Sequence, residues 1–276
     1  MIRDIVVHLS LTEDKDNTAD FAISVAKTFD AHLTGAVFAY ALSLASITTI
    51  DALPGEVIEQ QQIENERVAK AAVDRFKSAA SKSEVSSQGN IFKGGLGYAA
   101  KNFAEMARRF DLSIVGQQPA DELAPELIVE SALFESGRPV LIVPYIQTES
   151  LKLDTVLVCW DGSRAAARAL ADAGPFLSRA KSLQLVIVEG EPGKGDESPG
   201  ADIAQHLARH RLSVNVKRLD RGGIDVPNVI LSYAADCSAD LIVMGGYGHS
   251  RFREFVLGGV TRTMLASMTV PVLMSH

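Results

Sequence analysis

Cysteine is scarce in this 276-residue sequence, and its scarcity excludes two common ways of stabilising a small domain. The only two cysteines, Cys159 and Cys237, lie in the segments VLVCW and AADCSAD, and neither has metal ligands at the spacing of a zinc site. A disulfide framework or a structural zinc ion is therefore not expected. We predict that both thiols are buried and inert, in a reducing compartment.

An excess of positive charge is also missing. The formal net charge is −7 and the sequence contains no long basic run, whereas a nucleic-acid-binding protein usually has a basic face, so we expect no nucleic-acid partner. The longest weakly apolar run, residues 36–50, is shorter than the ~20 residues that span a membrane, so we expect no membrane insertion. Asp4 follows Met1-Ile2-Arg3 directly and the next segment has the pattern of a strand, which predicts no signal peptide and a cytoplasmic location.

Two nucleotide fingerprints are absent from the sequence. A G-x-G-x-x-G motif should follow the first strand of a dinucleotide-binding domain, but neither Leu9-Ser10-Leu11 nor Trp160-Asp161-Gly162 supplies it. A P-loop of the form G-x4-G-K-[ST] is absent as well. These absences disfavour a nicotinamide or flavin oxidoreductase.

An internal repeat organises the chain. With 47% hydrophobic and 22% charged residues, 276 residues are enough for two ordinary domains with full cores. Matching apolar segments begin, continue and end each half, and they are separated by alanine-rich helical patterns. The matching pairs are 4–9 with 154–159, 33–38 with 183–188, 111–116 with 240–245, and 138–143 with 270–274. The sequence therefore predicts domains 1–145 and 152–276, joined by the polar linker 145–152.

Each half is predicted to alternate strands and helices in the order β-α-β-α-β-α-β-α-β. Continuous apolar strands between amphipathic helices indicate a parallel sheet that is covered on both faces. The first half also carries an insertion at residues 39–55, followed by a long helical pattern. We expect the apolar face of that helix to pack on the core, with a lid over a pocket as the alternative. The residues of this face are Val57, Ile58, Ile63, Val68, Ala72, Val73 and Phe76.

A glycine-rich segment follows one of these strands near the end of the chain. Leu241 to Met244 form an apolar strand pattern, and Gly245, Gly246 and Gly248 come next. A second pair, Gly258-Gly259, opens a helical pattern. Glycine lets the backbone approach a ligand closely, and the free N–H groups at a helix start favour an anion, so the segment is typical of phosphate binding. A tight turn without a ligand is the alternative interpretation.

The spacing of these glycines, G-x2-G-x9-G, resembles the nucleotide motif of the universal stress protein family. The resemblance implies two Rossmann-like domains, each a five-stranded parallel sheet in the order 3-2-1-4-5, with a ligand where the strand order reverses. It also implies a site for ATP or AMP, with Mg²⁺ accompanying ATP; no cofactor is expected to be needed for folding. The matching positions are Asp161, Val188, Met244, Gly245, Gly248, Gly258, Gly259 and Val260.

Several of these positions also have a purely structural interpretation. Asp161 could contact a ribose or, like Ser163, cap the next helix, and Val188 is also an ordinary core position. Between the glycine pairs, His249 and Arg251 could clamp a phosphate or lie in a solvated loop. No carboxylate or nucleophile can be paired with His249, so it is not assigned as a base.

The sequence departs from the family motif at Gly259. The family has Ser or Thr there, and loss of that hydroxyl costs about 1–3 kcal/mol of binding if nothing replaces it. The first half lacks the motif altogether, because Gly116 is followed by Gln117-Gln118-Pro119-Ala120-Asp121-Glu122 and strand one ends without an aspartate. We therefore expect a single site, in the second half.

The resemblance implies a regulatory or scaffold protein of the stress response rather than an enzyme, with slow ATP hydrolysis at most. The alternative is a scaffold of the same family that binds no nucleotide and acts through protein partners or another small ligand. Family members pair through their last strands, so residues 139–144 and 271–276 could pair within one chain as an internal pseudo-dimer. Further homodimerisation is left open.

Overall fold

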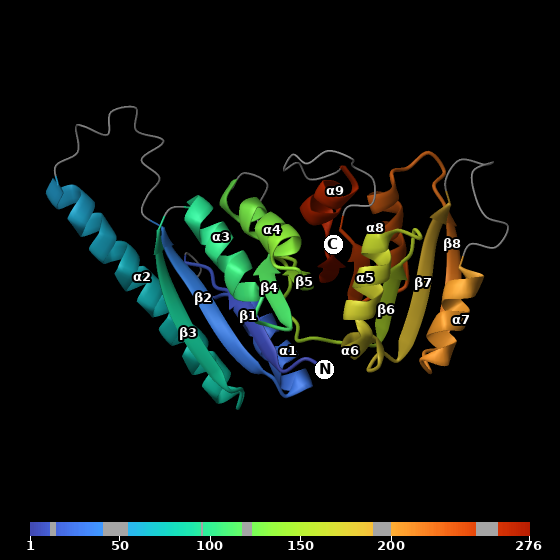
Figure 1. Cartoon of the computed structure of the whole chain (residues 1–276), viewed down its shortest axis with the longest axis horizontal. Helices are drawn as coiled ribbons and strands as arrows, with labels where there is room; N and C mark the ends of the chain where they lie inside the picture. Colours follow the sequence, from blue (N-terminus) through green and yellow to red (C-terminus); the bar gives the residue numbers. More distant parts are fainter. Residues whose placement is uncertain (12–14, 41–54, 95, 118–122, 190–199, 247–258) are drawn as a thin grey trace.

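All ten strands in the described part of the chain form one continuous sheet, and helices cover both of its faces (Figure 1). The computed structural model describes residues 1–11, 15–40, 55–94, 96–117, 123–189, 200–246 and 259–276. The strand order is β3-β2-β1-β4-β5-β10-β9-β6-β7-β8. The strands are β1 (Asp4–His8), β2 (His32–Tyr40), β3 (Ser87–Gly94), β4 (Leu112–Gly116), β5 (Val140–Val143), β6 (Thr155–Cys159), β7 (Ser182–Glu189), β8 (Val214–Asp220), β9 (Leu241–Gly245) and β10 (Val272–Ser275).

Helices alternate with these strands, as the sequence pattern predicts. They are α1 (Asn17–Phe29), α2 (Gly55–Lys82), α3 (Leu96–Ala107), α4 (Leu123–Glu135), α5 (Arg164–Asp172), α6 (Gly174–Leu177), α7 (Ala201–Arg209), α8 (Val226–Asp236) and α9 (Gly259–Ser267). The short helix α6 follows α5 directly and has no counterpart among the described residues of the first half.

Each half of the sheet has the expected strand order 3-2-1-4-5, and the two five-stranded halves form one continuous sheet. The two halves join at β5 and β10, which pair antiparallel, while every other neighbouring pair of strands is parallel. Leu141 lies opposite Leu273 at this junction, and both side chains are fully buried. The expected pairing of the two last strands within one chain is therefore confirmed.

The duplication extends to single hydrogen bonds. Asp111 precedes β4, and its Oδ2 accepts from the backbone N–H groups of Arg3 and Asp4, at 2.8 and 3.1 Å. Asp240 precedes β9, and its Oδ2 accepts from Asp154 and Thr155, both at 2.8 Å. One carboxylate in each half thus aligns the start of the first strand with the start of the fourth.

The core consists of two apolar layers, one on each face of the sheet. One layer packs under α1, α2, α5, α6 and α7. The other packs under α3, α4, α8 and α9. Both layers run across the β5–β10 junction, so the two halves share their hydrophobic core. Phe29 of α1 and Phe176 of α6 illustrate this, because their rings lie edge to face at 4.8 Å across the halves.

Helix α2 behaves in two ways along its 28 residues. Its C-terminal part packs on the sheet as expected, with Ala72, Val73 and Phe76 buried. Ile63 is 62% exposed, so the expectation that it packs on the core is wrong. Figure 1 shows the reason: the N-terminal part of α2 extends outward beyond the sheet. The inserted residues 41–54, for which a lid was the alternative, lie outside the described residues.

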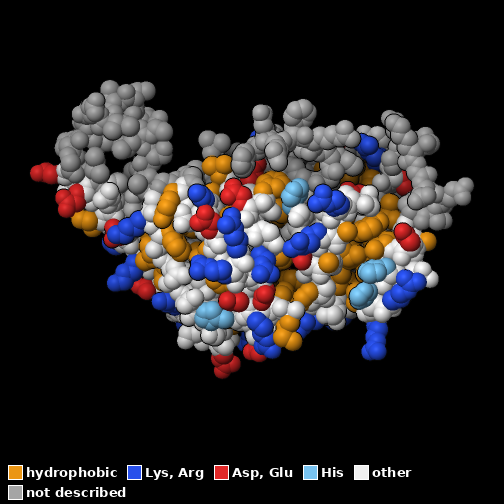
Figure 2. Space-filling view, in the orientation of Figure 1, with side chains coloured by type: hydrophobic (Ala, Val, Ile, Leu, Met, Phe, Trp, Pro, Cys, Tyr) orange, Lys and Arg blue, Asp and Glu red, His pale blue; other side chains and the backbone are white. Residues whose placement is uncertain are grey.

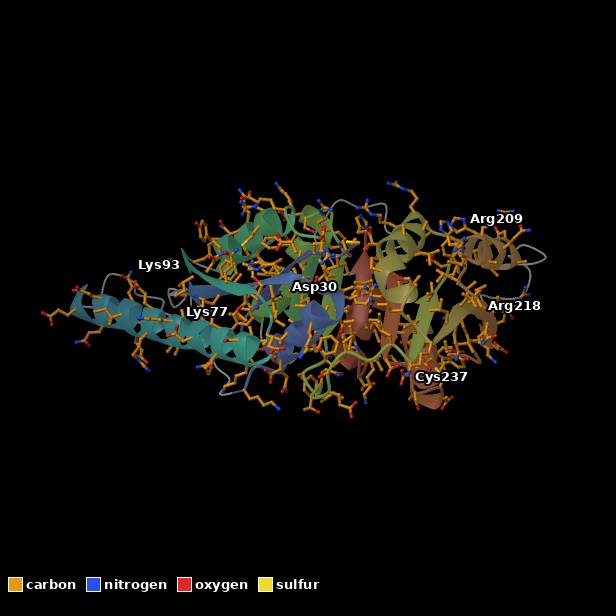
Figure 3. The ribbon with its side chains drawn as sticks, turned by 90° about the horizontal axis from the view of Figure 1, so that it is seen from below. Asp30, Lys77, Lys93, Arg209, Arg218 and Cys237 are labelled. Atoms are coloured by element: carbon orange, nitrogen blue, oxygen red, sulfur yellow. The ribbon has the colours of Figure 1, made fainter. Side chains whose placement is uncertain are left out.

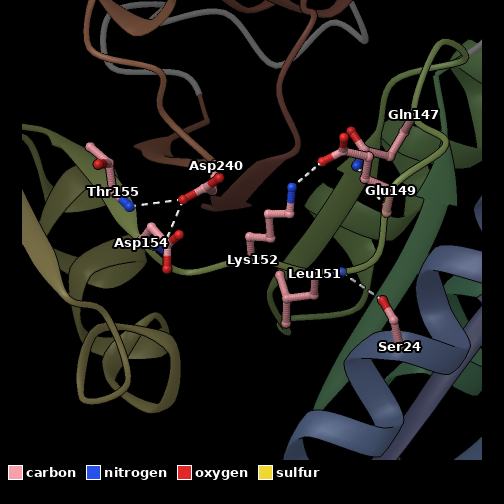
Figure 4. A network of polar contacts seen from close by, with 8 residues as sticks. All are labelled: Ser24, Gln147, Glu149, Leu151, Lys152, Asp154, Thr155 and Asp240. Atoms are coloured by element: carbon pink, nitrogen blue, oxygen red, sulfur yellow. Dashed lines mark hydrogen bonds and ion pairs between the residues drawn. The ribbon is translucent and has the colours of Figure 1, made fainter.

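The segment between β5 and β6 forms neither helix nor strand, as expected for a linker. It is nevertheless fixed to both halves (Figure 4): the N–H of Leu151 donates to Ser24 Oγ of α1 at 2.8 Å, and Asp154 is held by Asp240. No helix in the described part of the chain is both long enough and apolar enough to cross a membrane.

Candidate functional site

The candidate site lies at the carboxyl ends of β6 and β9, where the strand order of the second half reverses. These two strands pair in parallel, with Val158 opposite Val243, so their C-terminal ends meet at one edge of the sheet. Asp161 follows β6 after Trp160, and Gly245 is the last residue of β9. In open α/β sheets this reversal point is where ligands bind.

Asp161 and Ser163 form the turn that starts α5. Ser163 Oγ accepts from the N–H of Ala166 at 3.1 Å, so the predicted capping role of Ser163 is confirmed. Asp161 Oδ1 accepts from the N–H of Ser163 at 2.9 Å, which fixes the carboxylate at the edge of the sheet. Asp161 is exposed, so a fixed carboxylate at this edge faces solvent. Carboxylate oxygens in this position can accept hydrogen bonds from ligand hydroxyls.

Gly245 has a structural reason to be glycine. A Cβ atom built on it would lie 2.5 Å from the backbone nitrogen of Ala166, in the first turn of α5. Gly116, the last residue of β4, also lies close to the first helix, but there the neighbour is a side chain: its Cβ would lie 2.6 Å from Thr18 Oγ1 in α1. Close packing of the fourth strand on the first helix therefore explains a glycine in both halves, with or without a ligand.

The other predicted positions fall into two groups. Val188 is half-buried near the end of β7, Met244 is 5% exposed in β9, and Gly259 and Val260 are exposed at the start of α9. Among the described residues, a Cβ atom on Gly259 would have no neighbour within 4 Å. Thr261 is buried, so its hydroxyl does not replace the one missing at Gly259. The remaining predicted positions, Gly248, His249, Arg251 and Gly258, lie outside the described residues.

Cys159 ends β6 two residues before Asp161. Burial raises the pKa of its thiol to about 12, and the negative charge of Asp161 adds to this effect. Such a thiol stays protonated at neutral pH and is a poor nucleophile. Both cysteines are free, and both residues are partly exposed, which differs from the predicted burial.

The equivalent edge of the first half is filled by aromatic side chains. In the strand registers, Phe38 of β2 takes the place that Val188 has in β7. The Phe38 side chain is 1% exposed and stacks on Phe92 at 5.1 Å and on His8 at 5.8 Å, while Phe103 packs edge-on against His8. In the first half, these rings fill the place at the sheet edge that corresponds to the solvent-exposed surroundings of Asp161 in the second half.

Contacts that no sequence pattern predicts link α9 to the first half. Gln117 is 8% exposed, and its Nε2 donates to the carbonyls of Leu265 and Ala266 at 2.8 and 3.3 Å. These carbonyls lie near the C-terminal end of α9, the helix that begins at Gly259. A residue after strand four of one half thus holds the last helix of the other. No pattern in the sequence could indicate a contact across 148 positions.

Comparisons with known proteins agree with the sequence signature. The model of the universal stress protein family matches residues 152–276. A universal stress protein of Synechocystis sp. is 31% identical over 147 residues, which cover 49% of this chain and 46% of that protein, so the chain spans about half the length of this curated relative.

Two solved structures resemble the whole chain. A universal stress protein from Archaeoglobus fulgidus superposes with a TM-score of 0.72 at 18% identity, covering 98% of this chain and 94% of that one. A putative universal stress protein from Pseudomonas aeruginosa gives 0.62 at 14% identity, covering 99% and 92%. At these identities the two structures show the fold alone. The second half, residues 152–276, thus matches the universal stress protein family, and the whole chain shares the fold of these two structures.

Proposed function

We propose that the chain is a regulatory or scaffold protein of the stress response that binds an adenine nucleotide, ATP or AMP, in its second half. The observation that carries the proposal is the placement of the glycine motif: Gly245, the first motif glycine, ends β9 beside β6, next to the exposed carboxylate of Asp161. This is the point of an open α/β sheet where ligands bind.

The described residues fit a nucleoside at this edge. Asp161 supplies a fixed acceptor for ribose hydroxyls, and Val188 supplies a half-buried apolar surface for a base. The start of α9 at Gly259 is exposed, and a helix start favours the negative charge of a phosphate. We assign Met244, Gly248, His249, Arg251, Gly258 and Val260 to the same site on the basis of their positions in the motif.

We further propose that residues 1–145 form a structural domain without a nucleotide site, and that residues 152–276 form the binding domain. The aromatic cluster around Phe38 supports the first assignment, because a fully buried ring takes the place of Val188. Nucleotide binding would serve sensing rather than turnover. Mg²⁺ would accompany ATP through its phosphates, because the described residues contain no group of three or more acidic, His or Cys side chains placed to hold a metal.

A second candidate function is a scaffold that binds no nucleotide and acts through protein partners. Gly259 favours it, because the hydroxyl that the family motif places there is missing and buried Thr261 does not replace it. The close packing of Gly245 on α5 also explains one motif glycine without a ligand.

The test is to purify the protein without added ligand, denature it and analyse the released small molecules by mass spectrometry. We expect an adenine nucleotide in near-stoichiometric amount, or calorimetric binding of ATP or AMP to the empty protein. Gly248→Val should abolish binding while the protein stays folded by circular dichroism. No nucleotide in the preparation, together with no binding at millimolar ATP or AMP, would support the second candidate instead.

A gain of affinity provides a sharper test of the same site. Gly259→Ser restores the missing hydroxyl, and its Cβ atom would meet none of the described residues within 4 Å. A hydrogen bond to a charged phosphate is worth about 1.5–3 kcal/mol, so we expect affinity to rise by about one to two decades. Gly174→Ser is the matched control, because its Cβ position is equally open and lies in α6. Equal affinities in all three proteins would argue against phosphate binding at this helix start.

A further inference from the structure

Two histidines lie side by side on the surface of α7, far from the candidate nucleotide site. Ile203 and Leu207 anchor this helix to the core, while His206 and His210 are exposed. The two imidazole rings are 4.7 Å apart, measured between centroids, and are tilted by 56°. Figure 2 shows histidine side chains gathered on the surface over α7. The spacing i, i+4 places both on one face of the helix.

The separation of the rings suits a shared metal ion. A zinc–imidazole bond is about 2.0–2.1 Å long and the ring nitrogen lies about 1.1 Å from its centroid, so the metal lies about 3.2 Å from each centroid. Two centroids 4.7 Å apart then subtend an angle of about 95° at the metal. This angle lies between the 90° of a square-planar or octahedral site and the roughly 109° of a tetrahedral site.

The surroundings of the pair leave both rings available. Among the described residues, neither imidazole takes part in a hydrogen bond or an ion pair. His210 is the C-cap of α7, and the partial negative charge at a helix C-terminus favours a bound cation. Arg209 opposes it electrostatically, and Figure 3 shows that Arg209 lies at the outer surface of the molecule. Asp202, one turn before His206, accepts from the N–H of Ile203 and completes no three-ligand group.

We propose that His206 and His210 bind one divalent transition-metal ion of the class that prefers imidazole, namely Zn²⁺, Ni²⁺ or Cu²⁺. Two protein ligands leave the other coordination positions to water. By the general order of divalent metal affinities, Cu²⁺ binds more tightly than Ni²⁺ or Zn²⁺. This site does not rest on the proposed nucleotide site.

The experiment is a calorimetric titration of the full, tag-free chain with ZnCl₂ at pH 7.5, repeated with CuCl₂ in a glycine-buffered competition. We expect one ion per chain, a rise in Tm with added Zn²⁺, and tighter binding of Cu²⁺. His206→Ala and His210→Ala should each weaken Zn²⁺ binding at least tenfold and remove the rise in Tm. Circular dichroism and Tm without metal establish that each variant is folded.

A register variant separates chelation from adventitious binding to surface histidines. Gln205→His combined with His206→Ala keeps the number of histidines on α7 but turns one of them to about 140° from His210, since each residue advances about 100°. We expect this double variant to bind Zn²⁺ as weakly as His206→Ala does. Affinity equal to wild type in the register variant or in either single variant would overturn the proposal, as would failure of the wild type to bind Zn²⁺.

Discussion

At the scale of single residues, His8 shows how burial determines a charge state. It ends β1 within the aromatic cluster, and its Nε2 is shielded from solvent without a hydrogen-bond partner in the described part of the chain. Burial lowers the pKa of His8 to about 4. The imidazole is therefore neutral at physiological pH and behaves as one more flat ring in the stack. The sequence offered no sign of this, because His8 is flanked by ordinary strand residues.

The lowered pKa makes folding stability depend on pH. Between about pH 6.5 and 4 the unfolded chain binds a proton at His8 that the folded chain does not, so stability falls with falling pH. The folding free energy that neutral His8 preserves is fully present above pH 6.5 and is lost as the pH falls through 4. It amounts to about 3 kcal/mol at most. We expect urea unfolding of His8→Leu to show a shallower loss of stability over this range than wild type. If stability fell with pH equally steeply in both proteins, His8 would not control the loss of stability in acid.

At the scale of elements, the alternation of apolar strands and amphipathic helices predicted nearly every element, and the family resemblance implied the strand order of each half. Prediction succeeds here because periodicity is local: the burial of β4 and β9 on both faces is visible in LSIV and LIVM. It failed for the N-terminal part of α2, where Ile63 continues the apolar stripe past the edge of the sheet. The point at which a helix extends beyond its sheet depends on the lengths of strands that are distant in sequence, so a local pattern cannot predict it.

The glycine motif shows the same limit of prediction from local sequence at the candidate site. Spacing identified both Gly245 and Gly259, but the structure gives them different surroundings. A Cβ atom on Gly245 would meet the backbone of α5, whereas one on Gly259 would meet none of the described residues within 4 Å. A side chain at Gly245 must push α5 from β9, because the nearest atom is backbone and cannot rotate away. Sequence alone could not separate the packing glycine from the exposed one.

A pair of substitutions tests this distinction through stability. We expect Gly245→Val to lower the free energy of unfolding by more than about 2 kcal/mol, because overpacking a core contact typically costs 1–3 kcal/mol and here the partner is backbone. Gly259→Val should change it by less than about 1 kcal/mol, since a valine at an exposed helix start costs little. Chemical denaturation measures both, and a similar loss in the two variants would contradict the packing role of Gly245.

At the scale of the whole molecule, the antiparallel pairing of β5 with β10 turns two repeats into one sheet. The sequence predicted this pairing through the resemblance of the last strands, but not that the helix layers would also merge. Three residue pairs across the junction, Ile142–Val272, Leu141–Leu273 and Val140–Met274, are all fully buried. Strands β5 and β10 are equivalent edge strands of the two halves, and both are buried on both faces. Because they pair with each other, neither half has a free edge at the junction. The two halves should therefore unfold together.

Gln117 gives this union a polar connection that can be cut without touching the sheet. Its Nε2 donates to the carbonyls of Leu265 and Ala266 in α9, and its Oε1 accepts from the N–H of Tyr145 at 3.2 Å. Gln117→Leu keeps the volume but removes these part-buried hydrogen bonds, and a typical hydrogen bond contributes about 0.5–1.5 kcal/mol to stability. The carbonyls near the end of α9 then lose their partner from the first half.

We expect amide hydrogen exchange in residues 259–267 to be faster in Gln117→Leu than in wild type, because the last turn of α9 opens more readily. Exchange in β7 and β8, at the far edge of the sheet, should be unchanged. Gln88→Leu is the matched control, since Gln88 Nε2 donates to Thr34 Oγ1 within the first half alone. Unchanged exchange in α9 would mean that apolar packing alone holds this helix. Faster exchange confined to α9 would show that the half without a glycine motif steadies the helix at which the proposed nucleotide site begins.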